Sequence, residues 1–420
     1  MFTKILFLYS VINVGDAGHV KAVYESLNTK LHPLTKYEFH INGNTEELIS
    51  SFKDVTTKLE DEHYVVFAVG EKGAEALKTL SDAKLIRTDE AYVGLGIHQY
   101  FDIISQLPLD YISIPEAVVN SLSESAAGSE AAAGVPDKKN VVDSIPKHTL
   151  TFSVPTANPS LDVLKKSYDE WATKDKPDVN KQYIVVMLPG DAPDSLGQMQ
   201  YFTKDSASLL FNAVESLWKQ HPDYTVIVEN GPRTGKFDPT SGNIQCSHEY
   251  TKGEDAAIAI DPVSKHFVQL LEQHGGIPHS FFNFTFEVDG SAKKAHSVFN
   301  QLLYLTQSNS ENFFIIPGES VSMLGQIPLY ISSHKAIVFK PSSMNSNHEE
   351  IFINAFAKNF ISYFQEDGSI VNAKENIKRE LDDSARVAEG IIAGYNDKFT
   401  EDEVNVIIGD MSLTEIIDFQ

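Results

Sequence analysis

The chain has 420 residues, a length that predicts two domains rather than one core. Its content of 42% hydrophobic and 22% charged residues is ordinary for a globular protein and excludes wholesale disorder. The formal net charge of −24 disfavours nucleic acid and anionic lipid as partners. An anionic ligand would therefore need a local pocket of N–H groups and selected cations.

The cysteine content and the N-terminal segment bear on the compartment. Cys246 is the single cysteine, so an intramolecular disulfide, a Cys-rich zinc site and a CxxC pair are excluded. The apolar start is interrupted by Gly15 and Asp16 before a signal peptide would be complete. We interpret it as a buried strand and predict a cytoplasmic protein, because no apolar run approaches the roughly 20 residues of a membrane span.

The N-terminal part alternates short apolar runs with segments of helical periodicity. The run ILFLY at residues 5–9 is continuous, as in a parallel strand buried on both faces. Such alternation with short connections predicts a doubly wound parallel sheet. The predicted strands are residues 5–9, 37–41, 64–69, 84–87 and 110–114, and the predicted helices are residues 17–31, 45–59 and 72–80.

The next segment, residues 121–148, is rich in Ser, Ala, Gly and charge and predicts a mobile insertion or linker. A predicted helix at residues 161–173 leads into the polar segment KDKPDVNK, which we interpret as a hinge. The predicted domains are an N-terminal Rossmann-like domain over residues 1–175, a C-terminal one over 176–365 and a helical tail over 366–420 that packs across the hinge.

The second alternating series begins with the apolar run YIVVML. Its pattern again predicts a parallel sheet, so the predicted fold class is α/β with two Rossmann-like domains. The predicted strands are residues 183–188, 224–229, 280–288, 312–316, 329–331 and 336–340, and the predicted helices are residues 204–221, 262–274, 292–306, a short one from Glu319, 348–364 and 374–395.

The motif GDAGH follows the first predicted strand, where a doubly wound fold places ligand-facing loops. Gly15 and Gly18 would let the backbone approach a ligand, and His19 is a candidate general base. A tight turn in which His19 only caps or packs is the simpler explanation of the motif. The third glycine of a dinucleotide fingerprint is missing.

The motif NGPRTGK follows the strand at residues 224–229 and resembles a phosphate-binding loop. It is one residue short of GxxxxGK and has Phe237 in place of the metal-binding Ser or Thr, which disfavours a P-loop NTPase. Arg233, beside Thr234, could pair with a phosphate through its forked guanidinium. A surface turn with solvated cations is the alternative.

The motif PGESVSM joins a strand to a short helix. Gly318 and the hydroxyls of Ser320 and Ser322 predict an anion site at the helix start. A plain N-cap by Ser320, supported by Glu319, is the simpler alternative.

The start of the predicted helix at residues 348–364 is acidic, which suits its dipole. Glu349, Glu350 and Asn354 also carry groups of the kind that bind sugar hydroxyls. Neither HExxH nor an EF-hand signature occurs, so we predict no metal and no cofactor.

These motifs occur in an order that resembles the mitochondrial-fission ELM-like family over most of residues 1–355. The matching segments are GDAGH, FAVGEKGAEAL, FDIISQLPLDYISIPE, VVMLPGDA, VENGPRTG and GESVSM. That family is similar to GT-B glycosyltransferases, in which two Rossmann-like domains hold a nucleotide sugar in a central cleft. The resemblance implies a GT-B-like architecture with both sheets facing such a cleft.

The resemblance also implies roles for individual residues. Gly18 and His19 would lie on the acceptor side, and Arg233, Ser320 and Ser322 would hold the donor diphosphate. The donor sugar would contact Glu349, Glu350 and Asn354. GT-B transfer generally needs no bound metal, which agrees with the missing metal motifs.

Three functions remain open at this stage. The first is metal-independent glycosyl transfer from a nucleotide-diphosphate sugar to an unknown acceptor. The second is a catalytically degenerate scaffold that binds or regulates, because residues 324–328 replace the family's ribose-binding helix and Pro232 replaces an Arg. The third is a nucleotide-sugar epimerase or hydrolase on the same architecture.

Overall fold

The 420-residue chain divides into two compact units, Met1–Ala157 with Asp382–Gln420, and Asn158–Leu381. The computed structural model describes residues 2–10, 14–31, 33–41, 45–95, 107–115, 148–152, 158–171, 176–193, 198–241, 243, 245–246, 248–251, 259–274, 276–289, 292–379 and 383–399. The predicted mobile insertion, up to residue 147, lies outside the described residues.

The first unit contains a six-stranded sheet of order β2-β1-β3-β4-β5-β6, in which every described pairing is parallel. Its strands are β1 (Lys4–Tyr9), β2 (Thr35–His40), β3 (Tyr64–Val69), β4 (Ala91–Leu95), β5 (Tyr111–Pro115) and β6 (His148–Phe152). The strand order reverses between β1 and β3. In an open α/β sheet this reversal separates the following loops and creates a crevice at the carboxyl ends of the strands.

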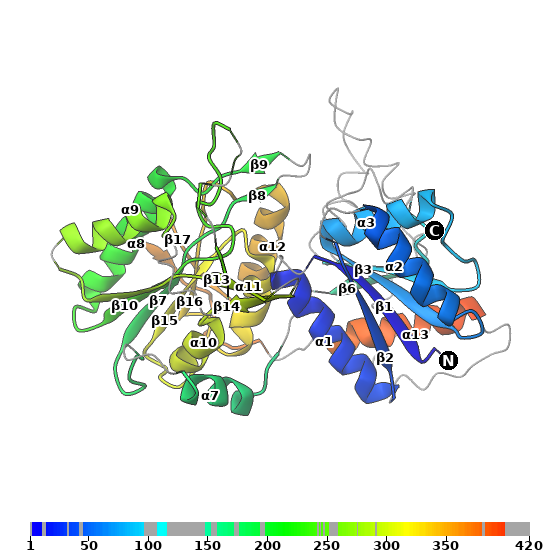
Figure 1. The fold of residues 1–420 in the computed structure, drawn as a ribbon. Helices are drawn as coiled ribbons and strands as arrows, with labels where there is room; N and C mark the ends of the chain where they lie inside the picture. The colour runs from blue at the N-terminus through cyan, green and yellow to red at the C-terminus, as the bar shows by residue number, and fades with distance from the viewer. Residues whose placement is uncertain are drawn as a thin grey trace, which may run out of the picture. The chain divides into compact units, whose positions relative to one another are not determined.

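Helices cover both faces of this sheet (Figure 1). They are α1 (Val14–Lys30), α2 (Thr45–Lys58), α3 (Gly70–Asp82) and α13 (Asp383–Phe399). Because side chains alternate along a strand, Leu6 and Leu8 pack into the core with α2 and α3. Phe7 faces the other side, where its ring lies 6.4 Å from that of Tyr24 in α1.

The second unit contains a seven-stranded sheet of order β12-β10-β7-β15-β16-β17-β18. Its strands are β7 (Tyr183–Met187), β10 (Thr225–Glu229), β12 (His279–Phe282), β15 (Phe313–Pro317), β16 (Ala336–Phe339), β17 (Ser362–Phe364) and β18 (Ile370–Val371). The first six are parallel and β18 is antiparallel. In chain order the parallel strands run 3-2-1-4-5-6, the Rossmann order, with the reversal between β7 and β15.

Two pairs of helices cover this second sheet. They are α8 (Lys204–Gln220) with α9 (Pro262–Gln273), and α7 (Leu161–Asp169) with α10 (Phe299–Gln307). Ile184 and Val186 of β7 belong to the core that includes α8 and α9. Phe314 of β15 faces α10, where its ring lies 6.1 Å from that of Phe299.

Short elements complete the second unit. Two follow β15 and β16, namely α11 (Val321–Gln326) and α12 (Ser346–Ala357), and a single 3-10 turn, η2 (Ile327–Leu329), extends α11. The small sheets are formed by β8 (Ala192–Pro193) with β9 (Met199–Gln200), and by β11 (Glu249–Thr251), β13 (Thr285–Asp289) and β14 (Ala292–His296).

The predicted α/β class with two parallel sheets is confirmed, whereas several element predictions are wrong. Residues 84–87 are a turn residue followed by irregular chain rather than a strand, because Lys84 adopts a left-handed backbone with φ 58° after α3. Residues 292–296 pair with β13 as a strand, so the helix predicted there begins only at Phe299. Residues 329–331 comprise the last residue of η2 and the two residues after it, and are not a strand.

The predicted C-terminal elements and the domain boundary also differ. The helix predicted over 348–364 ends at Ala357, and its last residues form β17; the one predicted from 374 begins at Asp383. The boundary lies after residue 157 rather than 175, because α7 packs on α10, with the rings of Tyr168 and Tyr304 5.3 Å apart. The predicted tail is divided, with α13 in the first unit and residues up to 381 in the second.

Candidate functional site

The carboxyl ends of four neighbouring strands of the second sheet carry a group of polar residues. Because β10, β7, β15 and β16 are adjacent and parallel, the loops that follow them meet at one edge of the sheet. These loops contribute Gly190 and Asp191 after β7, Arg233 after β10, Glu319 and Ser320 after β15, and His348 at the start of α12.

Gly190 is the point at which three of these loops meet. Its N–H donates to Oε1 of Glu319 at 2.6 Å. A Cβ atom added at Gly190 would lie 3.1 Å from Cβ of Arg233. The N–H of Asp191 donates to the Arg233 carbonyl at 3.1 Å. A glycine at this position thus lets Arg233 and Glu319 approach the same main-chain segment.

Arg233 is the exposed cation of this edge. Its side chain makes no hydrogen bond or ion pair with any part of the chain that the structure describes. Its charge nevertheless influences Asp191, Glu319 and His348, since it lowers the pKa of each of them. The guanidinium therefore lies close to three titratable groups and keeps its five N–H donors available for a ligand.

The two carboxylates are buried and only half satisfied. Oδ1 of Asp191 accepts from the N–H of Phe202 at 2.8 Å, while Oδ2 of Asp191 and Oε2 of Glu319 are buried without a hydrogen-bond partner. Burial raises the pKa of Asp191 to about 6 and that of Glu319 to about 7, against the opposing effects of their hydrogen bonds and Arg233. Glu319 is therefore partly protonated at neutral pH.

His348 is a neutral member of the group. It forms a capping box with Asn345, whose Oδ1 accepts from the His348 N–H at 3.1 Å. In return, Nδ1 of His348 accepts from the Asn345 N–H at 3.3 Å. Burial and the nearby Arg233 lower the pKa of His348 to about 4, so the ring carries no charge at pH 7.

The two serines of the PGESVSM motif lie at the start of α11. Ser320 occupies the N-cap position, yet its side chain accepts no capping hydrogen bond. Its Oγ instead lies 3.5 Å from Oγ of Ser322. The predicted support of this helix by Glu319 is also wrong, because the Glu319 carboxyl bonds to Gly190. Both half-buried hydroxyls remain candidates for a ligand.

Two residues predicted to bind a ligand have structural roles, and their contact with a ligand stays a prediction. Thr234 is buried, and its Oγ1 accepts from the N–H of Gly231 at 2.8 Å and donates to the Leu188 carbonyl at 3.4 Å. A Cβ at Gly318 would lie 2.9 Å from both Met344 Sδ and the Phe339 carbonyl oxygen. Thr234 therefore holds the loop, and Gly318 permits close packing of β15 against β16.

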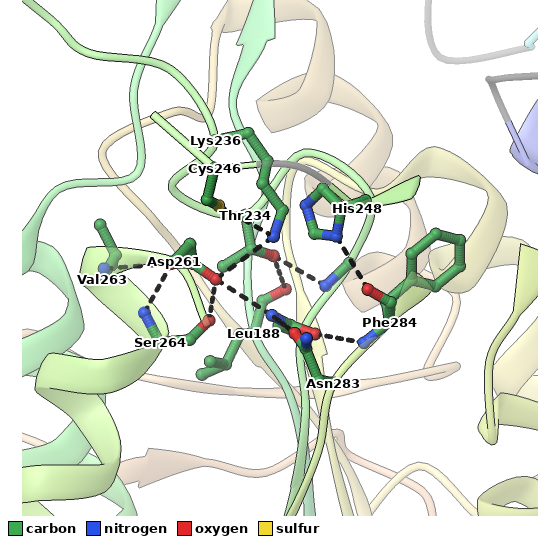
Figure 2. Close-up of polar contacts among 12 residues, drawn as sticks. Leu188, Thr234, Lys236, Cys246, His248, Asp261, Val263, Ser264, Asn283 and Phe284 are labelled. Atoms are coloured by element: carbon green, nitrogen blue, oxygen red, sulfur yellow. Dashed lines mark hydrogen bonds and ion pairs between the residues drawn. The ribbon is translucent and has the colours of Figure 1, made fainter. Parts of the chain in front are cut away.

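A buried polar cluster anchors the loop that carries Arg233 (Figure 2). Asp261 caps α9 by accepting from the N–H groups of Val263 and Ser264, and it accepts from Asn230 Nδ2 at 3.0 Å. Nζ of Lys236, a residue only 2% exposed, lies 3.7 Å from Asp261 Oδ2. Lys236 thus points into the protein, whereas Arg233 of the same motif points outward.

The residues predicted to bind the donor sugar lie on α12. Glu349 is exposed and pairs with Nζ of Lys340 at 3.0 Å, a surface contact of small energetic value. Glu350 and Asn354 are half-buried on the same helix. Their role toward a sugar stays a prediction.

In the first unit, the predicted loop GDAGH is part of a helix. Gly15, Gly18 and His19 all lie within α1, which begins at Val14, and the His19 side chain is half-buried. The backbone freedom expected of the two glycines is therefore not used in a turn. Asp16, which the sequence did not single out, is buried at the N-terminus of α3, where a Cβ at Gly70 would lie 2.5 Å from Asp16 Oδ2.

Metal and membrane binding were also considered. Among the described residues, no group of three or more His, Cys, Asp or Glu is placed to hold a metal ion. None of the helices in the described ranges is long and apolar enough to cross a membrane.

No protein-family model matches the sequence, and no curated protein matches it either. Among solved structures, a candidate UDP-N-acetylglucosamine 2-epimerase from Listeria monocytogenes is 10% identical, with 97% of this chain and 100% of that chain covered and a TM-score of 0.46. The UDP-GlcNAc 2-epimerase from Neisseria meningitidis, bound to UDP-GlcNAc, is 12% identical, with coverages of 93% and 99% and a TM-score of 0.44.

A trehalose-6-phosphate protein from E. coli, bound with UDP-2-fluoro glucose, is 9% identical, with 94% of each chain covered and a TM-score of 0.43. Similarities this low do not assign a function, so the function must be argued from the chain's own residues. The resemblance to the mitochondrial-fission ELM-like family stays a prediction.

Proposed function

We propose that the protein is a glycosyltransferase whose second unit binds a nucleotide-diphosphate sugar at the reversal between β7 and β15. The observation that carries the proposal is Arg233. In a protein with a net charge of −24, this arginine is exposed at the carboxyl edge of a Rossmann-ordered sheet and has no partner in the described chain. A forked cation at that place fits a diphosphate. The motif resemblance to the ELM-like family and its GT-B-like architecture point to the same ligand class.

In the proposed reaction, an acceptor hydroxyl attacks the anomeric carbon while the bond to the diphosphate breaks. Arg233 balances the negative charge that develops on the departing diphosphate, and the hydroxyls of Ser320 and Ser322 donate hydrogen bonds to it. These groups, rather than a metal ion, supply the electrostatic stabilisation. Glu350 and Asn354 are the proposed contacts to the donor sugar.

The proton of the acceptor hydroxyl needs a base, and the motif resemblance implies His19 for that role. Gly15 and Gly18, on the same first turns of α1, are the proposed main-chain neighbours of the acceptor. A His19→Gln variant would then retain donor binding and lose transfer, which separates this role from a structural one.

A second function is favoured by one observation. The Glu319 carboxyl already occupies the Gly190 N–H next to Arg233, and Thr234 and Gly318 have structural roles. A protein with its ligand groups engaged in this way could serve as a binding scaffold without catalysis. Whether it binds a nucleotide sugar and whether it transfers the sugar are therefore measured separately.

A thermal-shift screen against UDP, GDP, CMP and TDP sugars tests the proposed donor site. A ligand at 100 times its dissociation constant should stabilise the protein by about 2.7 kcal/mol. We expect the shift to disappear in Arg233→Ala and to shrink in Ser320→Ala. The control is Lys219→Ala, which removes an exposed positive charge from α8 of the same unit. The absence of a shift with every nucleotide sugar would refute the proposal. Release of free nucleotide without an acceptor would indicate hydrolysis or epimer chemistry instead of transfer.

A further inference from the structure

We infer that Glu319 binds the anionic part of the ligand as a neutral acid, so that anion binding at Arg233 is coupled to protonation of this one carboxyl. In this arrangement Oε1 keeps the hydrogen bond from the Gly190 N–H, and the proton on Oε2 is donated to a phosphate oxygen. The inference rests on the proposed function, because it concerns the same anion site, and it adds a protonation requirement to it.

The geometry of Glu319 assigns a separate task to each oxygen. Oε1 accepts from the Gly190 N–H at 2.6 Å, and Oε2 is buried with no hydrogen-bond partner. An ionised carboxylate has only acceptors, so it would repel a phosphate next to Arg233. A protonated one offers an O–H donor at the atom that lacks a partner.

Arg233 is the cation next to Glu319. Its side chain makes no hydrogen bond or ion pair in the described chain, so it can swing toward a ligand without breaking such a contact. Gly190 brings the two residues together, because a Cβ there would lie 3.1 Å from Arg233 Cβ and 3.7 Å from Glu319 Oε1. The same anion can therefore meet the guanidinium and the acid.

The charges around Glu319 set the direction of the pH dependence. The titratable and charged groups next to it are Asp191 after β7, Arg233 after β10 and His348 of α12, of which His348 is neutral. Burial raises the pKa of Glu319 to about 7 in the free protein, and the negative charge of Asp191 adds to this effect, while Arg233 opposes it. A bound phosphate raises the pKa of Glu319 further.

The sign of the linkage follows from these pKa values. Below pH 7 Glu319 is already protonated in the free protein, so the ligand affinity is full and constant. As the pH rises through 7, binding must include the uptake of a proton, and the affinity falls by at most tenfold per pH unit. Asp191, with a pKa of about 6, and His348, with a pKa of about 4, have mostly completed their titration by pH 6.5.

The test is the dissociation constant of a nucleotide-diphosphate sugar between pH 6.5 and 8.5, measured by calorimetry. UDP-N-acetylglucosamine is the first probe, followed by the other sugars of the screen. Their phosphates are all esterified or bridged, so they lack the second ionisation near pH 6 of a phosphate monoester. For the wild-type protein we expect binding to weaken by about 25-fold across this range.

Three variants separate this role from a structural one. Glu319→Gln keeps an acceptor for Gly190 and offers an N–H in place of the acid proton, so it should bind with the low-pH wild-type affinity at every pH. Glu319→Ala should bind weakly throughout. Glu272→Gln, at an exposed carboxylate of α9, should retain the wild-type profile.

Two results would overturn the inference: wild-type affinity that does not change with pH, or Glu319→Gln binding as weakly as Glu319→Ala. If Glu319→Gln does not fold, the binding enthalpy of the wild-type protein is measured at pH 8 in two buffers of different ionisation enthalpy. The difference gives the number of protons taken up on binding. We expect nearly one proton, and an uptake of zero would refute the inference. No binding of any sugar to the wild type at pH 6.5 would remove the proposed function itself, a different outcome from pH-independent binding.

Discussion

Gly235 shows how a single residue determines the shape of the loop that carries Arg233. Its φ of 53° is left-handed, and a Cβ there would lie 2.4 Å from Oδ1 of the buried Asp261. Gly276 has a similar φ of 68° but nothing within 4 Å of the corresponding position. Comparing these two glycines therefore separates the free-energy cost of a left-handed backbone at a non-glycine residue from the cost of a steric clash of its side chain.

We expect Gly276→Ala to lower the free energy of unfolding by about 1 kcal/mol, the cost of a left-handed non-glycine residue. Gly235→Ala should cost about 3 kcal/mol, because the Asp261 carboxyl must also shift within its hydrogen bonds. Urea unfolding followed by circular dichroism measures both. An equal loss of unfolding free energy in the two variants would contradict this prediction, because it would show that the Asp261 cluster accommodates the added Cβ without strain.

At the residue scale, the sequence predicted which chemical groups lie in the candidate site, but not the burial and hydrogen bonds of each group. Arg233, Ser320 and Ser322 were found because cations and hydroxyls after predicted strands are visible in the letters. Glu319 was found too, yet assigned to the helix, because one sequence does not show which N–H a carboxyl reaches. Burial, which gives Asp191 and His348 their shifted pKa values, depends on chain segments that are distant in sequence.

At the scale of elements, helix α13 completes the first unit from the far end of the chain. Val387, Ala388 and Ile391 are fully buried on it, and Nζ of Lys398 lies 2.8 Å from Asp110 Oδ1. The ring of Tyr395 lies 4.9 Å from that of Phe2. The C-terminal helix is thus part of the core of the N-terminal sheet.

Truncating Ile391 to Ala should therefore destabilise the first unit by about 3 kcal/mol, the usual cost of a cavity at a buried aliphatic residue. Ile353→Ala on α12 is the matched control, because Ile353 is 54% exposed and should cost little. Scanning calorimetry can resolve two transitions if the units unfold separately. The prediction is wrong if Ile391→Ala shifts only the transition that belongs to residues 158–381.

Element predictions succeeded where periodicity was long and failed where it was short. Helices α2 and α8 and strands β3 and β7 were predicted to within about two residues, because their apolar patterns run over several turns or pleats. The strand β14 has the sequence AKKAH, which carries no strand periodicity. Its structure comes from pairing with β13, a partner that single-sequence propensity does not show.

At the scale of the molecule, buried carboxyls in both units make stability depend on pH. Burial raises the pKa of Glu90 in the first unit and of Glu229 in the second to about 7 each. Because these folded-state values exceed the unfolded value, the contribution is complete at low pH and is lost as the pH rises through 7. Each carboxyl should cost about 1 kcal/mol between pH 6.5 and 8.0.

Urea unfolding at several pH values tests this dependence. In Glu229→Gln the second unit should lose about half of its share of the slope, because Glu319 has a pKa that is raised equally, while the first unit keeps its own. His348 offsets part of this slope: its pKa of about 4 leaves it neutral in the folded state, whereas the unfolded residue is about half protonated at pH 6.5 and loses that proton by pH 8.0, which raises stability by about 0.4 kcal/mol. Stability that rises from pH 6.5 to 8.0 would contradict the assignment.

The two α/β units were predictable from alternation alone, whereas their strand orders were not. Alternating runs indicate parallel strands joined by helices, and both sheets are of this kind. Which strands become neighbours depends on packing between faces far apart in the chain. The division of the predicted tail at residue 382 has the same origin. The buried face of α13 packs in the first unit, although the second unit precedes it directly in the sequence.

Because the chain leaves the first unit after residue 157 and returns at residue 382, synthesis on a ribosome imposes an order on folding. The whole of the second unit is translated before α13, so it can fold first although it comes later in the sequence. Until α13 is made, the first unit exposes the apolar surface against which Val387 and Ile391 pack. A chain that ends before α13 would thus contain a complete second unit and an incomplete first unit, and the exposed apolar surface of the first unit would be a binding site for chaperones.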